Sequence, residues 1–142
     1  LDNLVWSYSP GAGEVKTVEH YGERYPGDEI VDMVGFDCYC NADLDGYRAS
    51  MKNALDITKA FADEHGKLMA VTETGYEGVK DPSWWTQVLY PVIKDYPVSY
   101  VLLWRNACEP HMQHHFYAPF PEHESAADFR AFASLEQILM IK

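Results

Sequence analysis

Four short apolar runs are spread along the chain, and each follows residues that favour a turn. They are rich in Val, Leu, Tyr or Trp and cover residues 4–8, 30–36, 68–72 and 99–104. Nearly continuous apolar character over so few residues is typical of strands that are buried on both faces, as in a parallel sheet. The pattern therefore predicts four buried strands.

Helical periodicity occupies the intervals between these runs. In the clearest interval, roughly residues 44–64, Met51, Leu55 and Phe61 recur at helical spacing until Gly66 stops the pattern. This spacing predicts a long amphipathic helix whose apolar stripe packs against the sheet.

Three weaker helical patterns complete the series. One is short and lies around residues 15–21, and a second covers about 82–94, with Pro82 near its first turn. The third begins at Ser125, and Asp128 three residues later fits a capping box. This last helix turns four apolar side chains inward: Phe129, Phe132, Leu135 and Ile138.

The alternation of strands and helices predicts an α/β fold with parallel strands and right-handed crossovers. Two architectures fit it, a small doubly wound sheet and half of a (β/α)8 TIM barrel. The phosphate-binding loop G-x-G-x-x-G expected of the first follows none of the four runs. A full barrel takes about 250 residues, so a chain of 142 residues is close to half of one.

The charge of the chain narrows the choice of partners. Asp and Glu number 22 against 11 Lys and Arg, which gives a net charge of −11. Such a surface repels phosphate backbones and anionic membranes, which argues against nucleic acid or lipid as the main partner. An aromatic share of 14% suits a sugar-binding cleft. A neutral polysaccharide fits both features, although solubility alone explains the charge equally well.

Cysteine and histidine positions predict neither a disulfide framework nor a metal centre. Cys38 and Cys40 are two residues apart in a strand-like run, so their side chains share a face and are badly placed to bond each other. His111, His114 and His115 have helical spacing, but no cysteine or carboxylate pattern completes a zinc site around them. We expect no metal and no cofactor.

Charged side chains stand at the carboxyl ends of the runs, where a barrel places its functional residues. After the second run, Asp37 and Tyr39 share the face of Gly35, which we expect to look into the barrel. A carboxylate there needs a partner, and Arg105 after the fourth run can provide it. Glu73 ends the third run just before a glycine turn. A solvated or ion-paired Glu73 and a purely structural Asp37–Arg105 pair are the alternatives.

Aromatic and amide side chains accompany these charges. Tyr8 ends the first run and is a candidate platform for a sugar ring, with a core aromatic as the alternative. After the fourth run, Trp104 can present its ring to a pyranose and Asn106 can donate to hydroxyl groups.

Several segments together resemble glycoside hydrolase family 26, the β-mannanases and their relatives. They read NLVWSYSP (3–10), YPGD (25–28), VDMVGFDCY (31–39), VTETG (71–75), VLLWRNA (101–107) and HHFYAPFPEHESAADF (114–129). The similarity spans nearly the whole chain, and the last two segments in this order are its most specific part. It implies that residues 1–142 form the C-terminal half of the catalytic barrel, strands five to eight, with no second domain.

Carried over residue by residue, the resemblance implies that Glu73 is the catalytic nucleophile and that Tyr39 hydrogen-bonds and orients its carboxylate. Trp104 would floor the subsite in which the glycosyl-enzyme forms, and Arg105 and Asp37 would form or support the neighbouring glycone subsite. The further substrate-binding candidates are Asn106, Tyr8 and His115.

The implied reaction is the endo-acting, retaining cleavage of β-1,4 bonds in mannan, galactomannan or glucomannan by double displacement. It needs two carboxyl groups about 5 Å apart, and the family's acid/base Glu ends strand four, which lies outside this sequence. Because the chain also starts at Leu1, almost directly on an apolar run, we expect it to be a piece of a longer protein and inactive by itself. The alternatives are relatives that cut β-1,3-xylan or mixed-linkage glucan, and a non-catalytic carbohydrate-binding half-barrel.

The resemblance also implies a partner and a location. The partner is a β-mannan-type polysaccharide, with no nucleic acid and no membrane, and the protein is expected to be secreted, periplasmic or at the cell surface. The open edges of a half-barrel, at residues 4–8 and 99–104, predict self-association or pairing with an N-terminal half-barrel.

Overall fold

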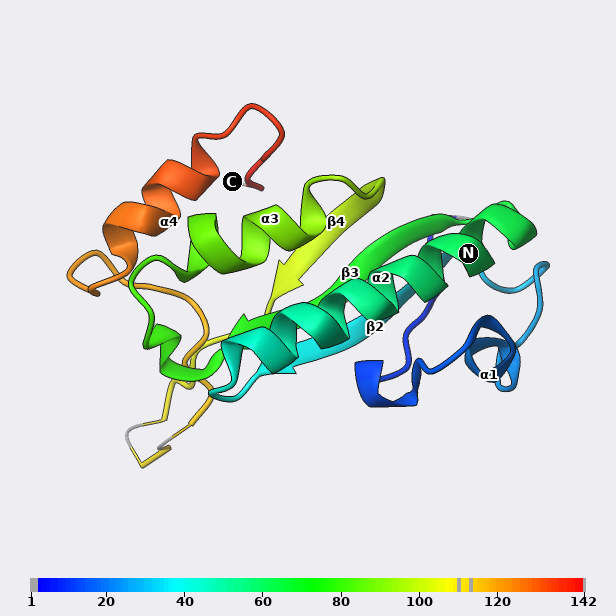
Figure 1. Cartoon of the computed structure of the whole chain (residues 1–142), viewed down its shortest axis with the longest axis horizontal. Coiled ribbons are helices and arrows are strands. Elements are labelled where there is room, and N and C mark those ends of the chain that lie inside the picture. The colour runs from blue at the N-terminus through cyan, green and yellow to red at the C-terminus, as the bar shows by residue number, and fades with distance from the viewer. Residues whose placement is uncertain (1–2, 110, 113, 142) are drawn as a thin grey trace.

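A parallel sheet organises the chain. The computed structural model describes residues 3–109, 111–112 and 114–141. Within them the strands are β1 (Ser7–Tyr8), β2 (Met33–Cys40), β3 (Leu68–Tyr76) and β4 (Val98–Leu103) (Figure 1). They lie in the order β1-β2-β3-β4, and every neighbouring pair is parallel. Because spatial order follows sequence order, the sheet is a stretch of a (β/α)8 barrel and not a doubly wound sheet, whose order reverses. The predicted fold class is confirmed.

The bare face of the sheet is concave. Burial raises the pKa of Tyr100 on β4, and the nearby side chain of Ser7 on β1 opposes this rise, although two strands lie between them in the sheet. The two edge strands therefore approach each other across this face, as they do in a barrel wall that curves toward closure.

The first strand is much shorter than predicted. Of the run 4–8, only Ser7–Tyr8 forms a strand, and Leu4, Val5 and Trp6 are 48%, 67% and 60% exposed. β1 is an edge strand that pairs with β2 alone, so its beginning has a neighbour on one side only. The prediction of a buried strand over residues 4–8 is wrong for its first three residues.

The second strand begins later than predicted and runs further. Ile30 and Val31 donate their amides to the carbonyl of Gly27, each at 3.1 Å, and this turn delays the start of β2 to Met33. β2 then continues through Cys40, so the polar residues beyond the predicted run belong to the strand itself.

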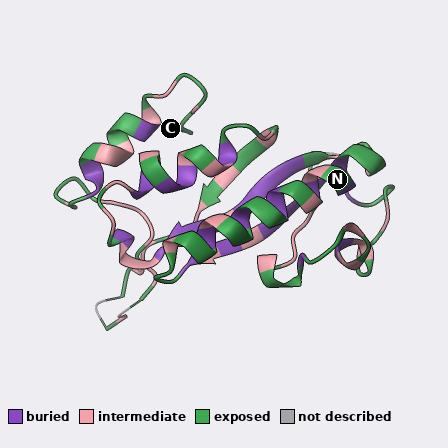
Figure 2. Cartoon of the chain, viewed as in Figure 1, coloured by how far each residue is buried: buried purple, intermediate pink, exposed green. Residues whose placement is uncertain are grey.

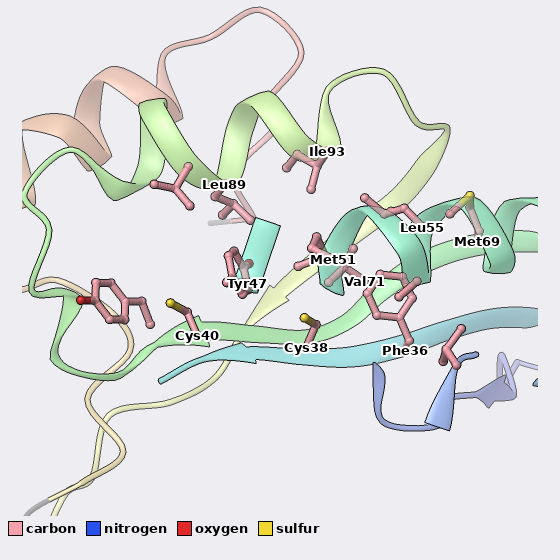
Figure 3. Packing of buried hydrophobic residues seen from close by; sticks show 14 of the residues in the cluster. Phe36, Cys38, Cys40, Tyr47, Met51, Leu55, Met69, Val71, Leu89 and Ile93 are labelled. Carbon is pink, nitrogen blue, oxygen red and sulfur yellow. The ribbon is translucent and has the colours of Figure 1, made fainter. Parts of the chain in front are cut away.

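The long helix α2 (Leu44–His65) matches the predicted amphipathic helix. Asp43 caps its start by accepting a backbone N–H of the first turn at 2.9 Å. Gly66 ends it with a φ of +62°, in the left-handed region that favours glycine. Met51 and Leu55 are fully buried in its apolar stripe, which packs on the sheet (Figure 3).

The remaining helical elements are short. They are the 3-10 turns η1 (Ala12–Glu14) and η2 (Glu77–Val79), the π-helical turn η3 (Trp85–Leu89), and the helices α1 (Val18–Gly22), α3 (Tyr90–Ile93) and α4 (Ala126–Ala133). The single helix predicted over 82–94 is thus divided between η3 and α3. Pro91 explains the division, because it has no N–H with which to close an α-helical bond at that point.

The start of α4 lies where the sequence predicts it, but the capping box does not form. Asp128 accepts instead from Thr86, through its N–H at 3.0 Å and its hydroxyl at 2.5 Å. Ser125 accepts from the indole N–H of Trp85 at 3.1 Å. Both side chains therefore fasten α4 to η3. The apolar residues predicted to face inward all contact the core: Phe129, Phe132, Leu135 and Ile138.

The core lies between the sheet and the helices that cover one of its faces (Figure 2). Phe36, Cys38 and Cys40 of β2 point into it. The three cysteines are free thiols, two of them buried and Cys108 exposed. None of the helices in the described ranges is both long enough and apolar enough to cross a membrane.

Candidate active site

The polar ends of β2 and β3 meet on the bare face of the sheet. A bulge between Phe36 and Asp37 shifts the register and sets Asp37 opposite Glu73. From there β2 alternates as the sequence predicts: Phe36 and Cys38 are buried on the helix side, whereas Asp37 and Tyr39 are only half-buried. The structure therefore brings Asp37, Tyr39 and Glu73 together.

Tyr39 holds the carboxylate of Glu73. Its hydroxyl donates to Glu73 Oε2 at 2.7 Å, a distance typical of a charge-assisted hydrogen bond. Burial, the bond to Glu73 and the charge of Glu73 raise the pKa of Tyr39 far above its ordinary value of 10.0, so the phenol keeps its proton at neutral pH. This is the hydrogen bond that the family resemblance implies, and the catalytic roles of the two residues stay predictions.

Asp37 is satisfied by hydroxyl groups and not by an arginine. Its Oδ1 accepts from Ser9 Oγ at 2.8 Å and from Thr72 Oγ1 at 3.0 Å. Burial raises the pKa of Asp37, the two hydroxyl bonds oppose this rise, and the nearby charge of Glu73 adds to it. Arg105 is exposed beyond β4, and no ion pair found among the described residues joins it to Asp37. The predicted Asp37–Arg105 pair is therefore wrong.

The segment after β4 is held close to the end of β3. Trp104 is half-buried and donates its backbone N–H to the carbonyl of Thr74 at 3.0 Å. Asn106 donates Nδ2–H to the carbonyl of Ala118 at 2.7 Å and accepts the N–H groups of Tyr117 and Ala118 at 2.8 Å each. These bonds leave the Asn106 amide one N–H for a ligand. Asn106 therefore fixes a loop, whereas the sequence predicts a donor to sugar hydroxyls.

Tyr8 does not line the bare face. Its hydroxyl donates to the carbonyl of Tyr21 at 2.9 Å, and its ring packs edge-on against Tyr21 and Tyr25 with centroids 5.2 and 5.6 Å away. Both partners belong to α1 and the turn after it, on the helix side of the sheet. The alternation of the strand turns Ser7 and Ser9 toward the site instead. The predicted sugar platform at Tyr8 is wrong.

His115 contributes hydrogen bonds to the site through its backbone. Its N–H donates to Glu77 Oε2 at 2.9 Å, and its carbonyl accepts from the N–H of Ala107 at 2.6 Å. The imidazole packs against that of His114, with centroids 4.3 Å apart, and no described group bonds its buried Nδ1. Across the described ranges, no three His, Cys, Asp or Glu side chains converge as a metal ion would require.

Two residues beside the Tyr39–Glu73 pair are missed by the sequence analysis. The ring of Tyr117 lies 5.3 Å from that of Tyr39, and it covers Gly75 so closely that a methyl group there would overlap it. Glu77 fastens the loop that carries Tyr117. The period of two along β3, from Glu73 through Gly75, extends to Glu77 and is a signal for it. Tyr117 lies in the segment 114–129 that carries the family resemblance, but no strand or helix period singles it out.

Fold and site together define the chain as a segment of a (β/α)8 barrel whose polar groups gather at the carboxyl ends of its strands, where such barrels carry their active sites. A sequence model of glycosyl hydrolase family 26 matches residues 1–87. The solved family 26 β-mannanase of Bacteroides ovatus is 46% identical and superposes with a TM-score of 0.91, over 97% of this chain and 39% of that one. The chain belongs to glycoside hydrolase family 26, as the resemblance implies.

Two curated mannan endo-1,4-β-mannosidases are also similar. The protein of Bacillus subtilis is 32% identical over 113 residues, which are 78% of this chain and 27% of that protein. The protein of Bifidobacterium adolescentis is 28% identical over 155 aligned residues, which cover 99% of this chain and 16% of that protein. The chain therefore spans less than a third of the length of either curated relative.

Proposed function

We propose that the chain carries the nucleophile of a retaining, endo-acting β-1,4-mannanase, and that this nucleophile is Glu73. The observation that carries the proposal is the 2.7 Å hydrogen bond from Tyr39 to Glu73 at the carboxyl end of a parallel strand. An attacking carboxylate must be ionised and aimed at the anomeric carbon. The Tyr39 hydroxyl donates to one carboxylate oxygen of Glu73 and so fixes its orientation. The named relatives are mannanases, and this supports mannan, galactomannan or glucomannan as the substrate.

In the first step Glu73 attacks the anomeric carbon, the glycosidic C–O bond breaks, and the leaving oxygen takes a proton from a general acid. In the second step that acid, now a base, takes a proton from water, and the water oxygen displaces Glu73 from the same carbon. Tyr39 holds the Glu73 carboxylate through both steps. Asp37 is already bound by two hydroxyl groups. We therefore assign the general acid to a part of the catalytic domain outside these strands.

The substrate contacts of this half of the site lie beyond β4. Trp104 is half-buried next to the end of β3, where its indole can floor the subsite of the glycosyl-enzyme. Arg105 is exposed beside it and can reach glycone hydroxyls. Flat ring faces and charged donors are the usual means of binding a pyranose, and both are in place on one segment.

Covalent trapping tests the proposal. A 2-deoxy-2-fluoro-β-mannosyl fluoride needs little acid assistance, because fluoride is a good leaving group. We expect mass spectrometry of the digested chain to find the mannosyl group on Glu73. Glu73→Ala should abolish the label, whereas Glu64→Ala, on the exposed side of α2, should leave it unchanged.

The same experiment separates the alternatives. An unlabelled chain that binds mannooligosaccharides equally well with Ala at position 73 is a non-catalytic carbohydrate-binding half-barrel. Faster trapping by a xylosyl or glucosyl reagent than by the mannosyl one would move the substrate to β-1,3-xylan or mixed-linkage glucan.

The open edges of the sheet support a proposed partner. β1 and β4 each have a neighbour on one side only, and the matched structure of the Bacteroides ovatus protein is more than twice as long as this chain. We propose that these edges pair with an N-terminal half-barrel or with a second copy. Because the proposed substrate is a polymer, we also propose a secreted, periplasmic or cell-surface location.

A further inference from the structure

The carboxylate of Glu77 fastens a loop that comes from far along the chain. Glu77 opens η2 directly beyond β3, and its Oε2 and Oε1 accept the N–H groups of His115 and Phe116 at 2.9 and 3.1 Å. Burial opposes its ionisation, but these bonds and one from the Tyr117 side chain outweigh burial and lower the pKa of Glu77. At neutral pH the carboxylate is therefore ionised, with a backbone donor on each oxygen.

Further contacts hold the same loop, residues 115–118. The N–H of Gly78 donates to the carbonyl of Phe116 at 2.8 Å, and Asn106 binds the loop from the other side through its amide. The loop keeps His115 at a φ of +68°, a left-handed conformation that residues other than glycine rarely adopt. Such a conformation persists only where the surroundings determine it, and it is found most often at functional sites.

The loop delivers the ring of Tyr117 to the candidate nucleophile. The ring lies over Gly75, where the lack of a Cβ allows the close approach. The same ring meets that of Tyr39, the cross-strand partner of Gly75, with centroids 5.3 Å apart. Tyr39 is the residue whose hydroxyl binds Glu73. A continuous set of contacts therefore runs from Glu77 through the loop and the two tyrosines to Glu73.

We propose that Glu77 is a positioning residue: by fixing residues 115–118 it presses the Tyr117 ring against Tyr39 and so holds the Tyr39 hydroxyl on Glu73. The inference rests on the proposed function only in naming Glu73 the nucleophile. Glu77 itself touches no reacting atom, because both of its oxygens are occupied by the loop. Its effect on the reaction passes through Tyr39.

The hydroxyl proton of Tyr39 reports this role directly. A phenol proton donated to a carboxylate in a half-buried site exchanges slowly with water and gives its own proton NMR signal, which is assigned by its loss in Tyr39→Phe. In Glu77→Gln one oxygen of the acceptor pair becomes an amide nitrogen. We expect the proton to exchange at least about tenfold faster, as loss of a hydrogen bond to a charged group implies. Glu64→Gln makes the same change in charge on the exposed side of α2 and should leave the exchange rate unchanged.

A second variant separates positioning from stability. Tyr117→Leu keeps both backbone N–H bonds to the Glu77 carboxylate and removes the Tyr117 ring together with its hydroxyl, so we expect the same acceleration while the amide protons of α2 stay protected. An unchanged exchange rate in Tyr117→Leu overturns the inference, whether or not Glu77→Gln folds. If the Tyr39 hydroxyl proton exchanges faster in the variants but the fluorosugar never labels Glu73, Glu73 is not the nucleophile, while the positioning role of Glu77 is supported. If the fluorosugar labels Glu73 but the exchange rate does not change, only the positioning role of Glu77 is contradicted.

Discussion

The centre and the edges of the sheet differ in how extensively their strands pair with their neighbours. β2 pairs with β3 along its whole length, and the Tyr39–Glu73 bond joins these two strands. β1 pairs at two positions only, and β4 meets β3 at three, with two shifts of register. Two of the expectations about the site that fail, the sugar platform at Tyr8 and the ion pair of Arg105, concern the edge strands and the segment beyond them. A strand with neighbours on both sides is determined by its own pattern, whereas an edge strand depends on what packs against it.

Truncating a leucine under the centre of the sheet should have the largest effect. Leu55 of α2 is 0% exposed and packs in the core against the sheet. Leu55→Ala leaves a cavity there and should lower the free energy of unfolding by about 2–5 kcal/mol. The same change at Leu102 of β4, which is 39% exposed, should cost less than about 1 kcal/mol. Urea unfolding of the two variants measures the difference, and equal losses would contradict the distinction between centre and edge.

The next largest effect is expected at the bond between the central strands. Tyr39→Phe removes the donor to Glu73, so trapping of Glu73 by the fluorosugar should slow by about 10- to 100-fold, since a hydrogen bond to a charged group contributes about 1.5–3 kcal/mol. Tyr100→Phe is the matched loss of a tyrosine hydroxyl on β4. Its trapping rate should stay within about twofold of the parent, as for other substitutions away from the reacting groups. Similar losses in both variants would mean that Tyr39 acts through general packing.

The sequence predicts the central strands well because a single periodicity decides their faces. Once residues 30–36 form a strand, the period of two separates Asp37 and Tyr39 from Phe36 and Cys38, and the structure has this arrangement. The long helix α2 follows for the same reason, since its apolar spacing and its terminal glycine are both local features.

Local sequence patterns do not predict the hydrogen-bond partners of the polar side chains. Asp37 is satisfied by Ser9 just beyond β1 and by Thr72 of β3, and the choice between these hydroxyls and an arginine depends on distances that only folding creates. Tyr117 reaches Gly75 through a loop whose course is decided by Glu77 and Asn106. The capping-box motif at the start of α4 is equally misleading, because its acidic residue has a better partner on η3.

Association through the open edges should be weaker than the effects at the centre but measurable. Leu102 lies on β4 beside the unpaired edge and is partly exposed. Leu102→Lys places a charge where another chain would pair, and it should weaken self-association by about tenfold, equivalent to about 1.4 kcal/mol. Light scattering over a range of concentrations measures this, with Ala127→Lys on the exposed side of α4 as the control. A parent chain that stays monomeric at high concentration would contradict the proposed pairing with a second copy.

The smallest effect is expected when acid protonates Glu77, whose carboxylate binds the loop 115–118 to the end of β3. The folded-state pKa of Glu77 lies below its ordinary value of 4.5, so its hydrogen bonds stabilise the fold above that pH and are lost as the pH falls through the folded value. Between pH 7 and pH 3, the free energy of unfolding of the parent should therefore fall more than that of Glu77→Gln. Asp37, whose pKa is raised, favours the fold in acid, but its contribution is common to both chains and cancels in the difference. Urea unfolding at several pH values gives the two curves. If the free energy of unfolding falls equally with pH in both chains, the ionised Glu77 carboxylate does not stabilise residues 115–118. The loop would then be held by Asn106 and the backbone hydrogen bonds alone.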